Sequence, residues 1–241
     1  VAVIMGLQNA DHFRRPADVQ TFYELGQRCA QLTYNSQNRI GSGSTDRIDG
    51  GISDFGAAII EAMNKVGMLV DVSHSGDRTT LDAIQLSKKP IAITHSNCRA
   101  LVDHPRVKRD EAIKALAANG GVMGITGVRM FVKKTDPTTI ADVVDHIDHV
   151  VKVAGIDHVG IGTDSDLNGY DDTTPETNKM LRGAYKDSYA FREKIDVDGF
   201  DHPLKMYDLT EELIRRGYSD ANIKAVLGGN FQRLLTATWG G

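Results

Sequence analysis

The chain has 241 residues, of which 41 % are hydrophobic and 25 % charged, so it can build the core of one large or two small globular domains. Its formal net charge of −4 gives no basic footprint of the kind that nucleic-acid binders need, and no apolar run approaches the roughly 18–20 residues of a membrane span. The two cysteines, Cys29 and Cys98, are far apart, which argues against a disulfide framework and against a cysteine-rich zinc site.

Short apolar segments that predict β-strands alternate with longer stretches of helical pattern. Gly, Ser, Asn or Asp bound most of the strand segments, which are Ala2–Leu7, Cys29–Thr33, Met68–Val72, Ile91–Thr94, Val122–Ile125 and Val159–Gly162. The predicted helices are Asp18–Leu25, Phe55–Val66, Thr79–Leu86, Asp110–Ala118, Ile140–Ala154 and Ser219–Thr236. Ser53 is expected to cap the second helix and Gly67 to end it.

This alternation predicts an α/β fold in which crossover helices join parallel strands and cover both faces of the sheet. Periodicity alone leaves a doubly wound sheet and a barrel open. The polar, irregular stretch over residues 165–203 follows the last predicted strand, and we expect it to form a long lid or substrate loop.

Polar side chains that can bind metal or carry protons follow several predicted strands directly. His74 and His95 come after two consecutive strands, and Asp164 comes after the last one. Because the carboxyl ends of parallel strands converge, the two imidazoles can reach one cation and Asp164 can exchange a proton with water. Gln8 and Tyr34 end the first two strands in the same way.

The remaining histidines fit structural roles better than metal binding. His146 and His149 have ligand-like spacing, but they lie in a predicted outer helix, where we expect a solvated face. The other four histidines are isolated, and Cys98 reads as a small buried residue.

The same segments resemble the membrane (renal) dipeptidase family of the metal-dependent amidohydrolase superfamily, in its bacterial form. The resemblance spans nearly the whole chain in order. It is carried by Gly67–His74 (GMLVDVSH), Pro90–Asn97 (PIAITHSN), Asp145–His149 (DHIDH), Gly160–Asp164 (GIGTD), Gln31–Asn35 (QLTYN) and Gly50–Gly56 (GGISDFG). It implies a TIM-type (β/α)8 barrel whose zinc site hydrolyses the amide bond of dipeptides or small N-acyl amino acids with a metal-activated water.

The resemblance also implies roles for individual residues. His74 and His95 match the two histidines that bind the more buried Zn²⁺, and Asp164 matches the aspartate that handles the proton of the attacking water. Arg106 matches the arginine that binds the substrate carboxylate, which suits a guanidinium fork. Asn97 and Gly162 are expected to line the same mouth.

Three features depart from the family pattern. The family's opening His-x-Asp strand is absent, and the six predicted strands resemble the third to the eighth. We therefore expect one barrel domain over residues 1–241 that lacks about two N-terminal βα units. Gln8 stands where the family has a bridging glutamate, so we expect one weaker metal site, or none, instead of a firm dinuclear centre. Tyr34 replaces a histidine of the mammalian enzymes, and its hydroxyl can donate to a developing oxyanion.

These departures keep a second hypothesis open, a catalytically impaired relative that binds a small ligand in the barrel mouth. An unrelated phosphate-binding barrel lacks support, because no Gly-rich loop with a following helix comes after the late strands. The expected partner is a dipeptide-like small molecule, with a homo-oligomer left open and no nucleic acid or membrane segment. We favour a cytoplasmic location, although the apolar start of the sequence carries no start methionine by which to judge a leader.

Overall fold

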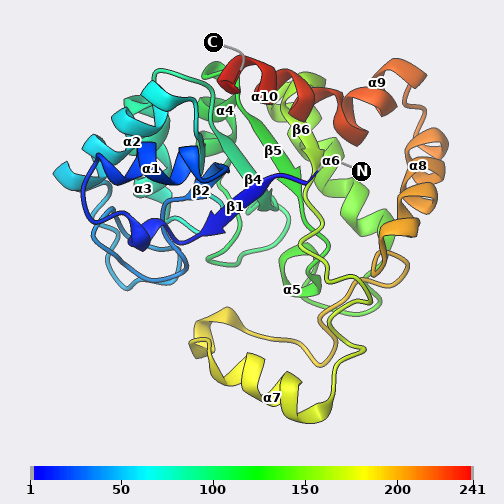
Figure 1. Cartoon of the computed structure of the whole chain (residues 1–241). Helices are drawn as coiled ribbons and strands as arrows, with labels where there is room; N and C mark the ends of the chain where they lie inside the picture. The colour runs from blue at the N-terminus through cyan, green and yellow to red at the C-terminus, as the bar shows by residue number, and fades with distance from the viewer. Residues whose placement is uncertain (1–2, 240–241) are drawn as a thin grey trace.

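The sheet of the computed structural model, which describes residues 3–239, contains six parallel strands in the order β1-β2-β3-β4-β5-β6 (Figure 1). All neighbouring pairs are parallel. The strands are β1 Met5–Gln8, β2 Gln27–Gln31, β3 Leu69–Asp71, β4 Ala92–Ser96, β5 Val122–Ile125 and β6 Val159–Ile161. All six predicted strands are thus confirmed, although the first prediction, Ala2–Leu7, begins at a residue outside the described range. Because spatial order follows chain order without reversal, the strands wind in one direction, as in a (β/α) barrel and unlike a doubly wound sheet.

Helices join successive strands and form a continuous outer layer. They are α1 Asp18–Glu24, α2 Asp54–Val66, α3 Asp77–Leu86, α4 Asp110–Ala118 and α6 Ile140–Ala154, and each contacts the next in this order. The predicted caps of α2 are confirmed, since the Ser53 hydroxyl accepts a hydrogen bond from the amide of Gly56 and Gly67 adopts φ 81°. A residue with a side chain would be strained at this φ, which is why glycine ends the helix.

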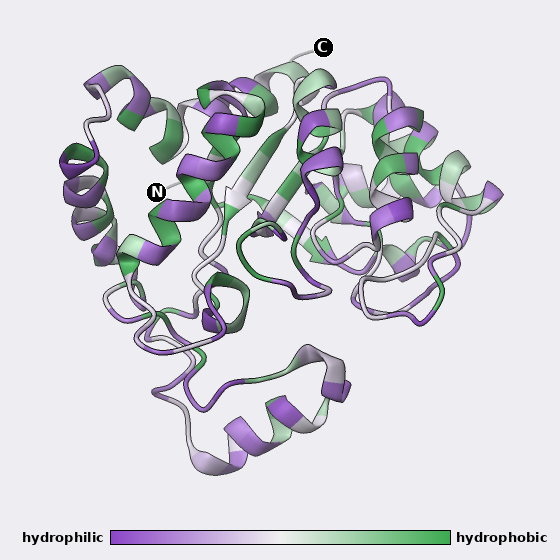
Figure 2. Cartoon of the chain, turned by 180° about the vertical axis from the view of Figure 1, so that it is seen from behind, coloured by the Kyte–Doolittle hydropathy of each residue, from purple (hydrophilic) through white to green (hydrophobic). Residues whose placement is uncertain are grey.

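The main core lies between the sheet and this helical layer. Buried aliphatic side chains of β2 to β6 pack there against the inward stripes of α2, α4 and α6, for example Val70 and Ile93 against Ile59 and Ile147. Figure 2 shows the corresponding pattern, in which green and pale residues prevail on the visible strands and the larger helices carry both hydrophilic and hydrophobic residues. This burial fixes the register of the strands, and with it the positions of the residues that follow them.

The C-terminal part packs on α6 and on the amino ends of the strands. It comprises α8 Met206–Arg215, α9 Asp220–Lys224, a π-helical turn Ala225–Gly229 and α10 Asn230–Trp239. The prediction of one helix over Ser219–Thr236 is wrong, because the backbone leaves the helical region at Gly228. Leu234 of α10 packs on the first residues of β3, β4 and β5, which are Leu69, Ala92 and Val122. The carboxyl ends of the strands therefore lie at the opposite end, towards α7 (Figure 1).

The segment over residues 165–203 is partly helical, which the prediction of a plain loop did not include. It contains α7 Pro175–Gly183 and the 3-10 turn Asp187–Tyr189. Together with α5 Arg129–Val132 it forms a second hydrophobic cluster in which Tyr189 and Ile195 pack near Phe131. Other 3-10 turns are Ala10–His12, Ile156–His158 and Pro203–Lys205.

A buried arginine of α5, Arg129, anchors the end of the segment over residues 165–203. The Arg129 side chain donates to Asp136 and to Asp198 at 2.5 Å each, and its Nε donates to the carbonyl oxygen of Asp196 at 2.6 Å. The segment is therefore tied near its C-terminal end, at Asp196 and Asp198. No helix among residues 3–239 is long and apolar enough to cross a membrane.

Candidate active site

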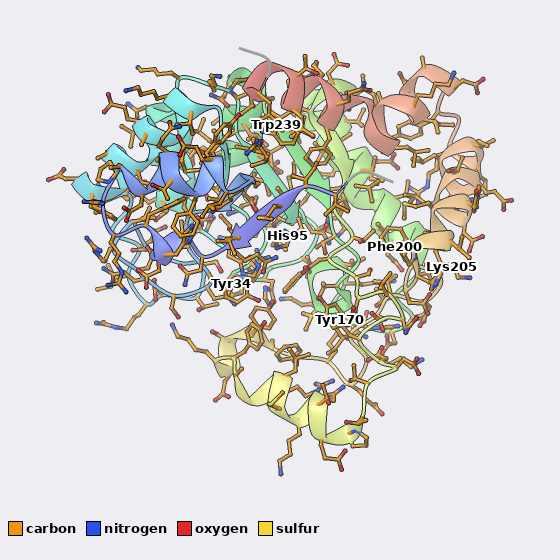
Figure 3. All side chains as sticks on the ribbon, in the orientation of Figure 1. Tyr34, His95, Tyr170, Phe200, Lys205 and Trp239 are labelled. Carbon is orange, nitrogen blue, oxygen red and sulfur yellow. The ribbon has the colours of Figure 1, made fainter. Side chains whose placement is uncertain are left out.

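Two buried histidines meet at the carboxyl ends of β3 and β4. His74 lies in the turn after β3, and His95 belongs to β4. Their Nε2 atoms are 2.9 Å apart, and the side chains are 2 % and 6 % exposed. Figure 3 labels His95 at the end of the sheet that faces the lid. The structure thus brings together two residues that the sequence places twenty-one positions apart.

Hydrogen bonds on the outer side of each ring turn the two Nε2 atoms towards each other. The Nδ1 of His74 donates to the side-chain oxygen of Asn35 at 2.8 Å. The Nδ1 of His95 lies 2.8 Å from the Thr94 hydroxyl, which itself donates to Asp71 at 2.6 Å. Each Nδ1 therefore carries the ring proton, and each Nε2 keeps its lone pair.

This pair of bare nitrogens fits a bound cation. Two lone pairs that face each other at 2.9 Å repel, and a cation bound between them would remove this repulsion. Burial and, second, the charge of Arg106 hold the pKa of His74 well below its usual 6.5. Burial also lowers the pKa of His95. Neither ring therefore readily takes up a proton that would supply a positive charge between the two nitrogens. Two ligands of a tetrahedral zinc lie about 3.3 Å apart, close to the distance between these nitrogens.

Asp164 lies near enough to His95 for its charge to act on that ring, but it is not a third ligand. No group of three or more His, Cys, Asp or Glu side chains among the described residues is placed to hold a metal ion. Asp164 lines a pocket of about 170 Å³ together with Gln8 and Tyr34, and its charge partly opposes the burial that lowers the pKa of His95. Its backbone has φ 54°, a conformation that is uncommon outside glycine and concentrates at functional sites.

Tyr34 lies between the histidines and the lid. Its ring stacks on His74 with centroids 4.0 Å apart, and its hydroxyl lies 2.7 Å from the hydroxyl of Tyr185. Burial, reinforced by Tyr185, raises the pKa of Tyr34, so the phenol keeps its proton. Figure 3 shows Tyr34 and Tyr170 between the sheet and α7. A protonated hydroxyl at this place is a hydrogen-bond donor at the mouth.

Arg106 lies close to His74 and is fully buried. One of its amino groups donates to the carbonyl oxygen of Ser73, the residue before His74. Its Nε and Nη2 have no hydrogen-bond partner within the described part of the chain. Two unpaired guanidinium donors in a buried setting form a fork of the kind that receives a carboxylate.

Three further predicted positions have different surroundings. Asn97 donates to the carbonyl oxygens of Thr126 and Phe131, so its amide holds these loops together. Gln8 ends β1, where it is exposed and borders both the 170 Å³ pocket and a cavity of about 460 Å³. Gly162 follows β6, and a Cβ there would lie 1.8 Å from the carbonyl oxygen of Thr94.

The expectation of a solvated face for His146 is wrong. Its side chain is 1 % exposed, accepts from the amide of Cys98 and lies 2.9 Å from the carbonyl oxygen of Val132. His149 is half-buried and pairs with Asp110 at 2.8 Å. Both are structural, and Cys98 is buried as expected, where burial raises the pKa of its thiol.

Sequence reasoning missed the polar residues that support the pair. Asp71 accepts hydrogen bonds from the Thr94 and Ser73 hydroxyls, and Lys108 lies buried below the turn that carries His74. The polar strand ends Asp71–His74 and Thr94–His95 were a usable signal for Asp71, Ser73 and Thr94. No sequence signal marks Lys108, which lies in a loop between Val107 and Arg109 and belongs to no predicted strand or helix.

Comparison with known proteins adds a family. The family model described as "Membrane dipeptidase (Peptidase family M19)" matches residues 1–178 and 190–239. The dipeptidase verJ of Clonostachys rogersoniana is 32 % identical over 98 % of this chain and 55 % of its own length. An uncharacterised dipeptidase, C965.12, of Schizosaccharomyces pombe is 36 % identical over 69 % of this chain and 42 % of its own. The chain thus spans about half the length of these curated relatives.

A solved structure is similar to this chain in both sequence and fold. The crystal structure of an amidohydrolase from Pseudomonas aeruginosa superposes with a TM-score of 0.87 at 34 % sequence identity. The match covers 98 % of this chain and 72 % of that one. A probable dipeptidase, PvdM, from the same organism, 24 % identical, has the same fold with a TM-score of 0.81.

Proposed function

The chain belongs to the membrane dipeptidase family, peptidase family M19, and on this premise we propose that it takes part in metal-dependent hydrolysis of the amide bond of dipeptides or small N-acyl amino acids. The observation that carries the proposal is the pair of bare Nε2 atoms of His74 and His95, 2.9 Å apart at the carboxyl ends of two strands. Such a pair is suited to a cation.

His74 and His95 would hold the metal in this proposal. A divalent cation such as Zn²⁺, when bound, supplies a Lewis acid that polarises the scissile carbonyl and acidifies water. The site is buried, so charges inside it interact more strongly than they would in water.

The remaining steps fall to the protein's own side chains. Asp164, which borders the pocket, takes the proton of the attacking water and returns it to the leaving amine. The free donors of Arg106 bind the carboxylate of the substrate, and the phenol of Tyr34 donates to the oxyanion that develops on the carbonyl. Gln8 and the lid segment over residues 165–203 border the substrate, and Asn97 supports the loop beside it.

The test pairs metal analysis with a hydrolysis assay on the purified chain and two histidine variants. We expect the wild type to bind Zn²⁺ and to hydrolyse dipeptides. His95→Ala should lose both the metal and the turnover while it keeps the fold, as judged by circular dichroism. His202→Ala removes an exposed histidine outside the site and should behave as the wild type. Zinc retained by His95→Ala at wild-type stoichiometry would contradict the assignment.

A second candidate is a catalytically impaired relative that binds a small ligand in the same mouth. It is favoured by the neutral Gln8 at the end of β1 and by the lack, among residues 3–239, of a third metal-binding side chain beside the histidine pair. This candidate predicts that the chain binds a dipeptide in isothermal titration calorimetry but shows neither zinc nor turnover.

A further inference from the structure

Asp71 is a buried carboxylate that the proposed reaction does not use. It is the last residue of β3 and is 3 % exposed. Its Oδ1 accepts from the amide of Ser73 at 2.9 Å, the hydroxyl of Ser73 at 2.6 Å and the amide of Thr94 at 3.1 Å. Its Oδ2 accepts from the hydroxyl of Thr94 at 2.6 Å. Four donors thus converge on one side chain next to both histidines.

The directions of these bonds determine which nitrogen of His95 carries the proton. A hydroxyl has one hydrogen, and the Thr94 hydroxyl gives it to Asp71. Towards the Nδ1 of His95, 2.8 Å away, Thr94 Oγ1 can therefore offer only a lone pair. The Nδ1 of His95 must then carry the hydrogen and donate it to Thr94 Oγ1. The Ser73 hydroxyl gives its hydrogen to Asp71 as well and accepts from the amide of His95 at 3.1 Å, so it cannot take the place of Thr94.

We propose that Asp71 is a positioning residue that, through the Thr94 hydroxyl, holds His95 in the tautomer with Nδ1 protonated and Nε2 bare. The inference deepens the proposed function, because the bare Nε2 is the atom that would bind the cation. Ligand histidines generally depend on such a partner behind the ring. Here the carboxylate acts through a hydroxyl and not by direct contact.

Asparagine at position 71 should reverse this tautomer. The three donors on Oδ1 hold the amide oxygen of the new side chain at that position, so its NH₂ group replaces Oδ2 and faces Thr94. The Thr94 oxygen then accepts, and its own hydrogen becomes free to point at the Nδ1 of His95. The ring proton moves to Nε2, where it can donate to the Nε2 of His74, 2.9 Å away, and blocks the cation position.

The direct test reads the tautomer and needs neither metal nor turnover. Long-range ¹H–¹⁵N correlation spectra of the metal-free chain distinguish protonated from bare ring nitrogens, and the His95 signals are assigned by their loss in His95→Gln. We expect Nδ1–H in the wild type and in the matched control Asp82→Asn, whose carboxylate accepts from Ile52 outside this network. We expect Nε2–H in Asp71→Asn.

A second pair of variants keeps the test decisive if Asp71→Asn does not fold. Thr94→Ser keeps the hydroxyl and should keep the Nδ1–H tautomer, whereas Thr94→Val removes the hydroxyl and should give a mixture. A folded Asp71→Asn that retains Nδ1–H would overturn the proposal. So would a Thr94→Val variant with the tautomer of the wild type.

Calorimetric titration with Zn²⁺ separates this inference from the proposed function. If both hold, Asp71→Asn should bind Zn²⁺ about 10- to 100-fold more weakly than the wild type. A wild type without zinc affinity that shows the expected tautomers would defeat the proposed function and leave the role of Asp71 standing. Equal zinc affinity of wild type and Asp71→Asn, with unchanged tautomers, would defeat the role of Asp71 alone.

Discussion

Replacing Lys108 by methionine should change how the stability of the protein depends on pH. The Lys108 side chain is 2 % exposed, and its three ammonium hydrogens meet three acceptors. These are the carbonyl oxygens of Val72 at 2.7 Å and Ser75 at 2.8 Å and the Thr80 hydroxyl at 2.9 Å. All three belong to the turn and helix start that follow β3, on either side of His74.

The magnitude follows from the pKa of this lysine. Burial, aided by the charge of Arg106, lowers the pKa of Lys108 from 10.5 to about 7 in the folded protein. Between these values the unfolded chain holds the proton and the folded chain does not, so the free energy of unfolding rises as the pH rises. From pH 7 to 9.5 this contribution amounts to about 3 kcal/mol. Methionine keeps most of the side-chain volume but cannot titrate, so this contribution disappears.

Urea denaturation at pH 7, 8 and 9.5 measures the effect. Subtracting the free energy of unfolding of the variant from that of the wild type cancels the contributions of all other groups that titrate alike in both proteins. The wild type should gain about 3 kcal/mol over Lys108→Met between pH 7 and 9.5. Lys114→Met, which changes an exposed lysine on α4, should show no such trend. A constant difference between wild type and Lys108→Met over this range would refute the reasoning.

Two further predictions concern other buried groups. Burial lowers the pKa of His146 from 6.5 to about 4, so the unfolded chain gains a proton first as the pH falls, and unfolding should become easier by about 3 kcal/mol between pH 6.5 and 4. His146→Gln should flatten this part of the pH profile in urea titrations, and an unchanged profile would contradict the prediction. Arg129→Met removes the anchor of the segment over residues 165–203 and should cost about 2 kcal/mol of stability. In that variant, amide hydrogen exchange should speed up around Asp196 and Asp198 but not in α2, and uniform acceleration would speak against a local anchor.

The strands and most of the helices could be predicted because their patterns are local. Val122–Ile125 and Ile140–Ala154 were predicted with the boundaries that the structure has, since turn residues and periodic apolar positions mark both ends. The short helix α7 was missed because its residues are polar. Thr174 as cap and Pro175 in the first turn were nevertheless a usable start signal. The break at Gly228 was missed, although the pair Gly228–Gly229 was a usable signal for it.

The burial of His146 could have been predicted from spacing. It lies three residues after Val143 and four before Val150, which are both buried, so it belongs to the inward stripe of α6. The meeting of His74 and His95 followed from the rule that parallel strands converge at their carboxyl ends. In contrast, no local pattern gives the order of donors and acceptors around Asp71. That order depends on differences of a few tenths of an ångström between side-chain distances across two strands.

Two glycines that pack closely against the backbone of Thr94 limit how this protein can be re-engineered. A methyl group at Gly162 would lie 1.8 Å from the carbonyl oxygen of Thr94, and one at Gly124 would lie 2.1 Å from it. Even alanine at either position must push the chain that carries His95, so libraries that randomise residues 124 and 162 should return almost only glycine there. Under the proposed function, variation that changes substrate preference without loss of the fold is better sought at Leu181 and Phe191, which line the pocket that Asp164 and Tyr34 border.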